Sequence, residues 1–330
     1  MRLPKRTVSC EKGPGDLDSA DAGPRDPWMY RIGSLGIESQ KRLVGIPESA
    51  HGHEARQIVW VTEPLLDGID SLVPHPSGAL WADPRVPDRW AAGARLQFRL
   101  HPASESIEVW SDSPAGLLLT HLVADCVVPF YLSTKKRLVL HGAACQTNVG
   151  VVGILGPSGE GKSTLVAYCV SQGLQFLSDD WLPIAIDGRG PAILAYPAHP
   201  SVRLHTAGLE TSGIGQGTGL LEDGDYNKRW LSLPESWCAT AQPLKRLVRL
   251  KRSGGKASFS ARRLGPEEAF RSVLERAFIL EVASPEAWSA VLEITVSATT
   301  MLPVYEVVLP EGRRGLSVML DWMSCHESEA

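Results

Sequence analysis

The segment GVVGILGPSGEGKSTLVAYCVSQG, residues 150–173, decides the fold of the chain. Its first six residues are an apolar, β-branched run typical of a buried strand. Residues Ser163–Gln172 have the spacing of a helix, and Gly173 stands where a C-terminal glycine cap is expected. Between strand and helix, Gly156–Thr164 matches the pattern GxxxxGK[ST] at every fixed position. Strand, glycine-rich loop and helix in this order predict a phosphate-binding loop.

Each fixed residue type in the loop has a chemical reason. Glycines allow left-handed backbone conformations, so that successive N–H groups can point at phosphate oxygens. The helix adds its free N–H groups and the positive end of its dipole. Lys162 supplies a charge for the β- and γ-phosphates, and the Ser163 hydroxyl is a ligand for Mg²⁺. We therefore expect ATP and Mg²⁺ as cofactors. The nucleotide-binding residues are expected to be Gly156, Pro157, Ser158, Gly159, Glu160, Gly161, Lys162, Ser163 and Thr164.

Two adjacent carboxylates follow the next expected strand, Leu174–Ser178. A strand–helix–strand unit of this length predicts a right-handed crossover between parallel strands, whose carboxyl ends lie at one edge of the sheet. Asp179 and Asp180 should therefore lie beside the phosphate loop. One can bind Mg²⁺ and the other can take the proton of an attacking hydroxyl. We assign Asp179 as the base and Asp180, with Ser163, as the metal ligands; a turn or a helix cap is the alternative.

The strand before the loop brings a histidine to the same place. Arg137–Gln146 and Gly150–Leu155 predict a hairpin whose turn lies at residues 147–150. The numbers of paired residues then add up to about 297, which places His141 opposite Gly156. An imidazole there can contact the γ-phosphate or an aspartate and take part in catalysis. A purely structural histidine is an equally good interpretation.

The order of these features resembles that of the HPr kinase/phosphorylase family. That family has an HG strand, a GxxGxGK[ST] loop and a strand that ends in a double aspartate; here they are His141-Gly142, Gly156–Ser163 and Asp179-Asp180. The resemblance covers about residues 137–205, under a quarter of the chain. It implies the α/β fold shared with phosphoenolpyruvate carboxykinases, a P-loop kinase core with a mixed sheet. It also implies Mg²⁺-dependent phosphoryl transfer from ATP to a serine hydroxyl.

Within this family, the chain is more similar to the HPr-kinase-like proteins encoded with ribosomal peptide natural products such as lasso peptides. Those proteins have LHxAA, GPSGxGKST and SDDW, followed by a Lys-Arg segment. The corresponding residues here are Leu140–Ala144, Gly156–Thr164, Ser178–Trp181 and Tyr226-Asn227-Lys228-Arg229. This resemblance implies a precursor peptide as the phosphate acceptor. The family's Glu-x-Arg-Gly segment is missing, and the nearest basic candidate for a substrate contact is Arg203.

Three functions stay open at this point. The first is an ATP-dependent kinase acting on a serine of a peptide or protein, and the second is a small-molecule kinase on the same scaffold. The third is a non-catalytic nucleotide-binding regulator, against which Asp179 and Asp180 argue because a regulator needs no base.

Two basic segments are candidate substrate contacts. Lys228 and Arg229 can bind phosphate or an acidic peptide, or form a solvated strand end. The basic run from Lys245 to Arg263 favours the exposed face of a hairpin, Leu247–Lys251 with Ala257–Ala261. The alternative for this run is a dock for an acidic substrate.

The rest of the chain divides into three parts. Residues 1–27 are rich in Gly, Pro, Asp and Lys without periodicity, so we expect disorder there. Residues 28–112 predict a small β-rich module, and residues 113–330 the catalytic domain. Further elements are expected as strands at Gln57–Thr62, Leu96–Leu100, Ser106–Trp110 and Val304–Leu309, and as helices at about 114–132 and from Pro266 and Pro285.

The composition favours a folded, cytoplasmic protein. Of 330 residues, 43% are hydrophobic and 21% charged, and the net charge of −4 gives no reason to expect nucleic acid or an anionic membrane as a partner. Six scattered cysteines without a CxxC pair favour neither a zinc site nor a disulfide scaffold. The most apolar run, Gly116–Leu132, is interrupted by His121 and Asp125 and is too short and too polar to span a bilayer. The sequence does not indicate an oligomeric state.

Overall fold

The structure is a computed structural model. It describes residues 28–32, 35–43, 46, 48, 55–61, 65, 73–74, 81–82, 89–92, 96–101, 106–111, 116–133, 135, 137–188, 190–215, 220–221, 228–252, 258–278 and 285–325. The disorder expected for residues 1–27 therefore concerns residues outside the described part. The same is true of Tyr226, Asn227 and Lys256.

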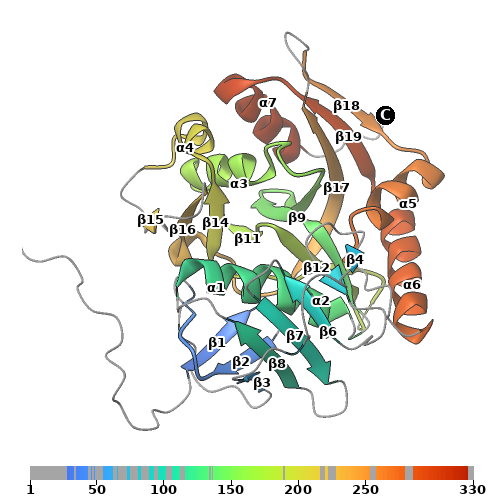
Figure 1. Ribbon diagram of the computed structural model, residues 1–330. Coiled ribbons are helices and arrows are strands. Elements are labelled where there is room, and N and C mark those ends of the chain that lie inside the picture. Colours follow the sequence, from blue (N-terminus) through green and yellow to red (C-terminus); the bar gives the residue numbers. More distant parts are fainter. Residues whose placement is uncertain are drawn as a thin grey trace, which may run out of the picture.

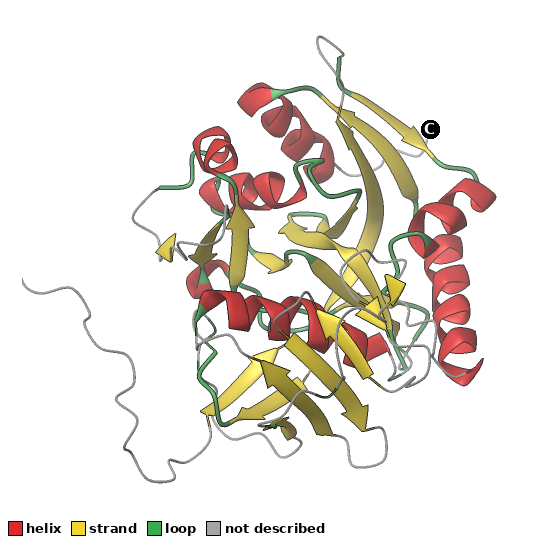
Figure 2. Ribbon diagram, in the orientation of Figure 1, coloured by secondary structure: helices red, strands yellow, loops and turns green. Residues whose placement is uncertain are grey.

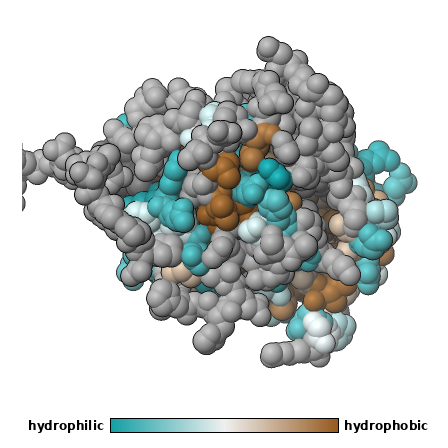
Figure 3. All heavy atoms as spheres, turned by 60° about the horizontal axis from the view of Figure 1, so that its bottom comes forward, coloured by the Kyte–Doolittle hydropathy of each residue, from teal (hydrophilic) through white to brown (hydrophobic). Residues whose placement is uncertain are grey.

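The N-terminal residues form an eight-stranded mixed sheet with the order β1-β2-β3-β8-β7-β6-β5-β4. Its strands are β1 (Trp28–Ile32), β2 (Leu35–Ser39), β3 (Ala55–Trp60), β4 (Val73–Pro74), β5 (Trp81–Ala82), β6 (Arg89–Ala92), β7 (Leu96–His101) and β8 (Ser106–Ser111). Three of them, β3, β7 and β8, confirm the expected strands. Figure 3 turns this end of the molecule forward, and among the described residues apolar and polar ones lie side by side there.

A helical segment, which we call the central helix, crosses the molecule between this sheet and the rest (Figure 1). It consists of α1 (Leu117–His121), the π-helical η1 (Leu122–Val127) and α2 (Val128–Ser133). One hydrophobic cluster joins its buried residues to the N-terminal sheet and to Trp181 and Ala198 of the other half. The expected buried helix is confirmed. Its π-helical turn carries a buried carboxylate, Asp125.

The second sheet is mixed, as expected, with the order β10-β9-β12-β13-β17-β19-β18 and with β11 paired to β9. Its strands are β9 (Leu138–Thr147), β10 (Gly150–Leu155), β11 (Phe176–Ser178), β12 (Trp181–Ile186), β13 (Ile193–Ala195), β17 (Gln242–Arg252), β18 (Ser260–Arg263) and β19 (Val304–Leu309). Because β17 also pairs with β10, the five strands from β10 to β17 in this order close into a ring.

The carboxyl ends of β10 and β11 lie close together along β9, at Gly142 and Ala144. Both strands run antiparallel to β9, so they are parallel to each other, as the crossover predicted. Leu155 pairs with Gly142, the expected register, and the Gly142 N–H donates to the Asp180 carbonyl at 3.2 Å. A Cβ on Gly142 would lie 2.8 Å from the Ile154 carbonyl oxygen, so only glycine fits this close approach.

Helices cover both faces of the second sheet (Figures 1 and 2). One face packs against α3 (Lys162–Ser171), α4 (Thr206–Ser212) and α7 (Gly312–Ser324). The other packs against α5 (Pro266–Leu274) and α6 (Pro285–Met301). Both α5 and α6 begin where the sequence predicted, whereas α7 was not predicted. Within the described ranges, no helix is both long and apolar enough to cross a membrane.

A small third sheet lies beside α3 and α4 (Figure 1). It has the order β14-β16-β15, and a short 3₁₀ helix, η2 (Pro234–Ser236), follows β16. The strands are β14 (Ser201–Leu204), β15 (Leu220–Leu221) and β16 (Arg229–Ser232). Arg203 lies in β14 and Lys228 directly before β16. Since β14 and β16 are paired, this sheet brings two candidate substrate residues to one place.

The expected hairpin between Leu247–Lys251 and Ala257–Ala261 is wrong. Strand β19 lies between β17 and β18, parallel to β17 and antiparallel to β18. Every residue of β18 is exposed, whereas the middle of β17, including Leu247, Val248 and Leu250, is buried. A buried strand needs an apolar partner on each side, and the valine-rich β19 supplies one, which leaves β18 at the edge.

Candidate functional site

The loop from Gly156 to Gly161 curves tightly through three glycines with left-handed or otherwise positive φ angles. These angles are 152° at Gly156, 89° at Gly159 and 94° at Gly161. A Cβ on Gly156 would also lie 2.9 Å from the Leu250 carbonyl oxygen. Gly161 is the N-cap of α3, whose first N–H groups have no partner within the helix. The loop therefore presents backbone donors at a helix N-terminus, an arrangement that favours anions.

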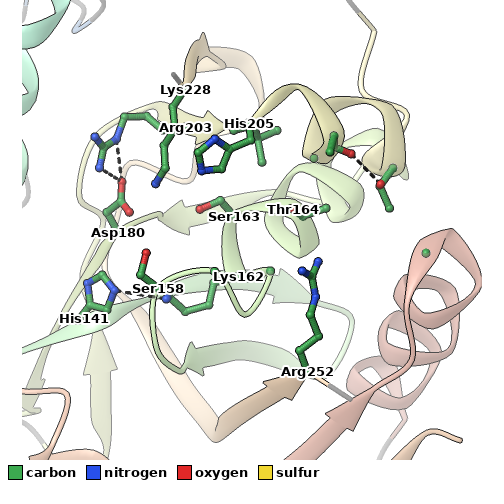
Figure 4. Close-up of a pocket in the computed structure, with 17 residues that line it drawn as sticks. His141, Ser158, Lys162, Ser163, Thr164, Asp180, Arg203, His205, Lys228 and Arg252 are labelled. Atoms are coloured by element: carbon green, nitrogen blue, oxygen red, sulfur yellow. Dashed lines mark hydrogen bonds and ion pairs between the residues drawn. The ribbon is translucent and has the colours of Figure 1, made fainter. Parts of the chain in front are cut away.

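The Lys162 side chain is buried and lies over its own loop. Its Nζ donates to the carbonyl oxygens of Gly156 and Pro157, both at 2.9 Å. The same Nζ lies 3.3 Å from Nε2 of His141 (Figure 4). Burial lowers the pKa of Lys162, and the charges of Asp179 and Asp180 oppose this shift.

His141 is neutral at pH 7 in this environment. Burial, followed by the charge of Lys162, lowers the pKa of its imidazole to about 4. An ammonium group can only donate, so Nε2 of His141 accepts the hydrogen bond from Lys162. His141 thus lies at the loop, where the sequence placed it, but it contacts the lysine rather than an aspartate.

Asp179 is 1% exposed and bonded to the loop helix. The Ser163 hydroxyl donates to Oδ1 at 2.9 Å, and the Arg203 N–H donates to Oδ2 at 3.2 Å. The paired oxygens of Ser163 and Asp179 are ligands that Mg²⁺ prefers. The described residues contain no group of three or more His, Cys, Asp or Glu side chains that could hold a metal ion.

Asp180 lines the cavity and has an unusual backbone conformation, with a φ of 65°. Its side chain is 15% exposed. Oδ2 accepts from Nε of Arg203 at 2.8 Å and from a second nitrogen of the same guanidinium. Burial raises the pKa of Asp180, but the charge and the hydrogen bond of Arg203 together with the charge of Lys228 bring the pKa below its usual value. Left-handed conformations of this kind gather at functional sites.

Arg203 is buried between two carboxylates. Besides Asp180, its Nε lies 3.5 Å from Oδ2 of Asp125, which belongs to the central helix. Asp125 was not expected at the site. The sequence feature that could have indicated Asp125 is its position as a charged residue inside the apolar run Gly116–Leu132.

A cavity of about 340 Å³ lies over these groups (Figure 4). Of the residues expected at the site, its lining includes His141, Ser158, Gly159, Gly161, Lys162, Ser163, Thr164, Asp180, Arg203 and Lys228. Those outside the lining are Gly156, Pro157, Glu160, Asp179 and Arg229. The lining also includes residues of α4 and Arg252, whose backbone N–H donates to the Glu160 carboxylate. The residues of α4 were not expected, whereas Arg252 belongs to the basic run for which a dock for an acidic substrate was the alternative.

The basic run around β17 and β18 is partly neutralised by acidic residues. Arg249 donates to Glu268 at 2.9 Å and to Glu306 at 2.6 Å. Arg262 donates to the same two carboxylates. These ion pairs connect α5 to β17, β18 and β19. Most of the described basic side chains of this run are exposed, but the run does not form the hairpin that the sequence predicted.

The buried Asp179 carboxylate should destabilise the fold at neutral pH. Burial, then the charge of Asp180, raises the pKa of Asp179 from 3.8 to about 6. The folded state therefore binds this proton more tightly than the unfolded state does. Its stabilising contribution is full below pH 3.8 and is lost as the pH rises through about 6. We expect Asp179→Asn to raise the thermal midpoint of the ligand-free protein more at pH 7.5 than at pH 5; an unchanged or lower midpoint at pH 7.5 would contradict this.

Comparisons with known proteins add little to this geometry. No protein-family model matches the chain. No curated protein matches it either. Among solved structures, the HPr(Ser) kinase/phosphatase from Coxiella burnetii matches with a TM-score of 0.31 and 11% sequence identity, over 56% of this chain and 94% of that chain. A likeness this weak does not assign an activity.

Proposed function

We propose that the chain is an ATP-dependent kinase that transfers the γ-phosphoryl group to a serine hydroxyl of a peptide or protein. One observation carries the proposal: the loop residues Lys162 and Ser163 line a single cavity together with the carboxylate of Asp180, and the Ser163 hydroxyl donates to the neighbouring Asp179. Phosphoryl transfer requires little covalent chemistry from the protein and depends on positioning and on charge stabilisation. Donors, cations and carboxylates of the required kinds are all present here.

The loop indicates which phosphates of the nucleotide lie beside which residues. Backbone N–H groups of such a loop bind the α- and β-phosphates, and its lysine reaches the β- and γ-phosphates. The γ-phosphate would then lie near Lys162, in the cavity that Asp180 also lines. On binding, Lys162 would exchange its two loop carbonyls for phosphate oxygens. His141 would keep the ammonium group at the mouth of the loop.

For the two aspartates we propose the reverse of the sequence-based order. Asp179 accepts from Ser163 and lies outside the cavity lining, which supports a metal-side role. Asp180 lines the cavity and supports the acceptor-side role of orienting or deprotonating a hydroxyl. The raised pKa of Asp179 by itself favours it as the base. The contacts decide the assignment, because a base must reach an acceptor hydroxyl in the cavity, and Asp180 rather than Asp179 lines the cavity. When bound, Mg²⁺ supplies charge neutralisation and orientation of the phosphates.

Positive charge at the cavity supports an anionic or peptide acceptor. Lys228 and Arg252 both line it without belonging to the loop. Arg203 is less suited to a direct substrate contact, because it is bonded to Asp180. We propose that the phosphate acceptor is a precursor peptide of the lasso type and that the protein acts in the cytoplasm. We also keep the division into a β-rich module at 28–112 and a catalytic domain at 113–330.

The proposal predicts a requirement for a divalent cation. Incubated with Mg²⁺ and ATP, the protein should form phosphoserine on a serine-containing peptide, detected by mass spectrometry. Excess EDTA should abolish the product, and added Mg²⁺ should restore it, because Ser163 and Asp179 offer a hard oxygen ligand pair. Full transfer in excess EDTA would contradict the metal-side assignment.

A further inference from the structure

A network of buried polar groups connects the central helix to the candidate catalytic aspartates. Its centre is Asp125, whose side chain is 3% exposed. Oδ1 accepts from Nε1 of Trp181 at 3.2 Å and lies 2.6 Å from Nε2 of His199. Oδ2 lies 2.8 Å from Nδ1 of His121 and 3.5 Å from Nε of Arg203. Four side chains from three parts of the chain thus converge on one carboxylate.

The partners of Asp125 are themselves fixed. His199 contacts the Ser201 hydroxyl at 2.8 Å through its second ring nitrogen, and its ring stacks on Trp230 with centroids 5.7 Å apart. Trp181 is fully buried and begins the strand that follows the aspartate pair. A carboxylate held in this way has little freedom to move, so it can hold Arg203 in turn.

Arg203 connects the fixed carboxylate of Asp125 to both candidate catalytic aspartates. Its side chain bonds to Asp180, and its backbone N–H donates to Asp179 at 3.2 Å. The guanidinium lies between Asp125 and Asp180, so each carboxylate limits how far it can shift towards the other. Asp180 has a conformation that needs support from its surroundings, because its φ of 65° is disfavoured for a residue with a Cβ.

We propose that Asp125 is a positioning residue for phosphoryl transfer, acting through Arg203 on Asp180. This inference rests on the proposed kinase function. It gives the π-helical turn of the central helix a role in the site, although the turn does not line the cavity. A purely structural role explains the network less well. Buried ionic clusters can often be replaced by apolar residues without loss of stability, so stability alone does not require Asp125. Holding Arg203 in place does require the negative charge of the Asp125 carboxylate.

The test compares Asp125→Asn with the wild-type full-length chain. The readouts are phosphate release from Mg²⁺-ATP, which needs no acceptor, and the Kd for Mg²⁺-ATP. A misplacement of about 1 Å at a reacting centre can lower a rate about 100-fold. We expect kcat to fall about 10- to 100-fold while the Kd stays within about twofold, because Asp125 does not touch the cavity. Equal kcat values would overturn the proposal.

The matched control is Thr120→Val on the same helix. Thr120 is fully buried and donates only to the Gly116 carbonyl, outside the network. Its loss should lower the thermal midpoint without changing kcat. If Thr120→Val lowers kcat as much as Asp125→Asn does, a general loss of stability of the central helix explains the effect. The positioning role is then overturned.

A double-variant cycle with Arg203→Lys tests the route. If Asp125 acts through Arg203, adding Asp125→Asn to Arg203→Lys should lower kcat little further. If the fold-reductions in kcat of the two single variants multiply in the double variant, the proposed route is overturned. Should Asp125→Asn fail to fold, Trp181→Phe keeps an aromatic ring and removes one donor to Asp125. It should lower kcat several-fold at constant Kd, and an unchanged kcat would count against the proposal.

Failure of the proposed function would look different. A wild-type protein that neither releases nor transfers phosphate from Mg²⁺-ATP contradicts the kinase function, and the positioning role falls with it. An active wild type with an equally active Asp125→Asn contradicts the positioning role alone.

Discussion

Replacing Lys162 by methionine should lower ATP turnover about 10³-fold or more while the protein stays folded. Methionine keeps an unbranched apolar chain in the buried position, so the change removes the ammonium group and little packing. That group lies at the mouth of the loop, within 3.3 Å of His141. Charge stabilisation of a transferring phosphoryl group typically contributes about 10³- to 10⁵-fold. The measurement is the steady-state rate of phosphate release from Mg²⁺-ATP, with the circular dichroism spectrum as the check on folding.

The matched control is Lys251→Met. Lys251 is exposed on β17 and lies outside the cavity lining. It should therefore keep the wild-type rate. A Lys162→Met protein that retains turnover within about tenfold of the wild type would contradict the role of this loop in binding the reacting phosphate.

Asp180→Asn should lower phosphoryl transfer about 10²- to 10⁴-fold while Mg²⁺-ATP still binds. The amide keeps the size and one acceptor oxygen for Arg203, but it cannot take a proton. Asp179→Asn should act differently, because its Oδ1 faces Ser163 rather than the cavity. We expect it to raise the Mg²⁺ concentration needed for half-maximal transfer. Both variants are measured by phosphate transfer and by nucleotide affinity over a series of Mg²⁺ concentrations.

The control for both aspartates is Asp321→Asn, an exposed position on α7. Should Asp179→Asn lose transfer at every Mg²⁺ concentration while Asp180→Asn shows the altered Mg²⁺ dependence, the sequence-based order of the two residues is right. Wild-type transfer in both variants would make the pair structural and remove the main support for a kinase.

The sequence was informative wherever the signal is local. The hairpin register that pairs Leu155 with Gly142 follows from a two-residue turn, and the parallel direction of β11 follows from the length of the crossover. The cap at Gly173, with its φ of 83°, follows from the tolerance of glycine for left-handed angles. These features together place Lys162, Asp179 and Asp180 beside each other without any long-range information.

Long-range features were not predictable from one sequence. The basic run from Lys245 to Arg263 suggested a hairpin of β17 with β18, whereas the more apolar β19 lies between them. The same holds for Arg203, whose position between two carboxylates depends on the packing of β14 against the central helix. Asp125 precedes Arg203 by many residues, so nothing in the local pattern links them. A charged residue inside an apolar run, as Asp125 is, nevertheless indicates that a buried carboxylate must find polar partners elsewhere in the chain.

The central claim is transfer of the γ-phosphoryl group to a serine hydroxyl. Its most direct test is incubation of the protein with [γ-³²P]ATP, Mg²⁺ and two peptides that differ only in serine or alanine at one position. A suitable pair derives from any short peptide encoded beside this chain's gene. We expect label on the serine peptide, none on the alanine peptide, and none on either with Lys162→Met. Label on both peptides, only on small molecules, or on nothing while ATP still binds would contradict the claim.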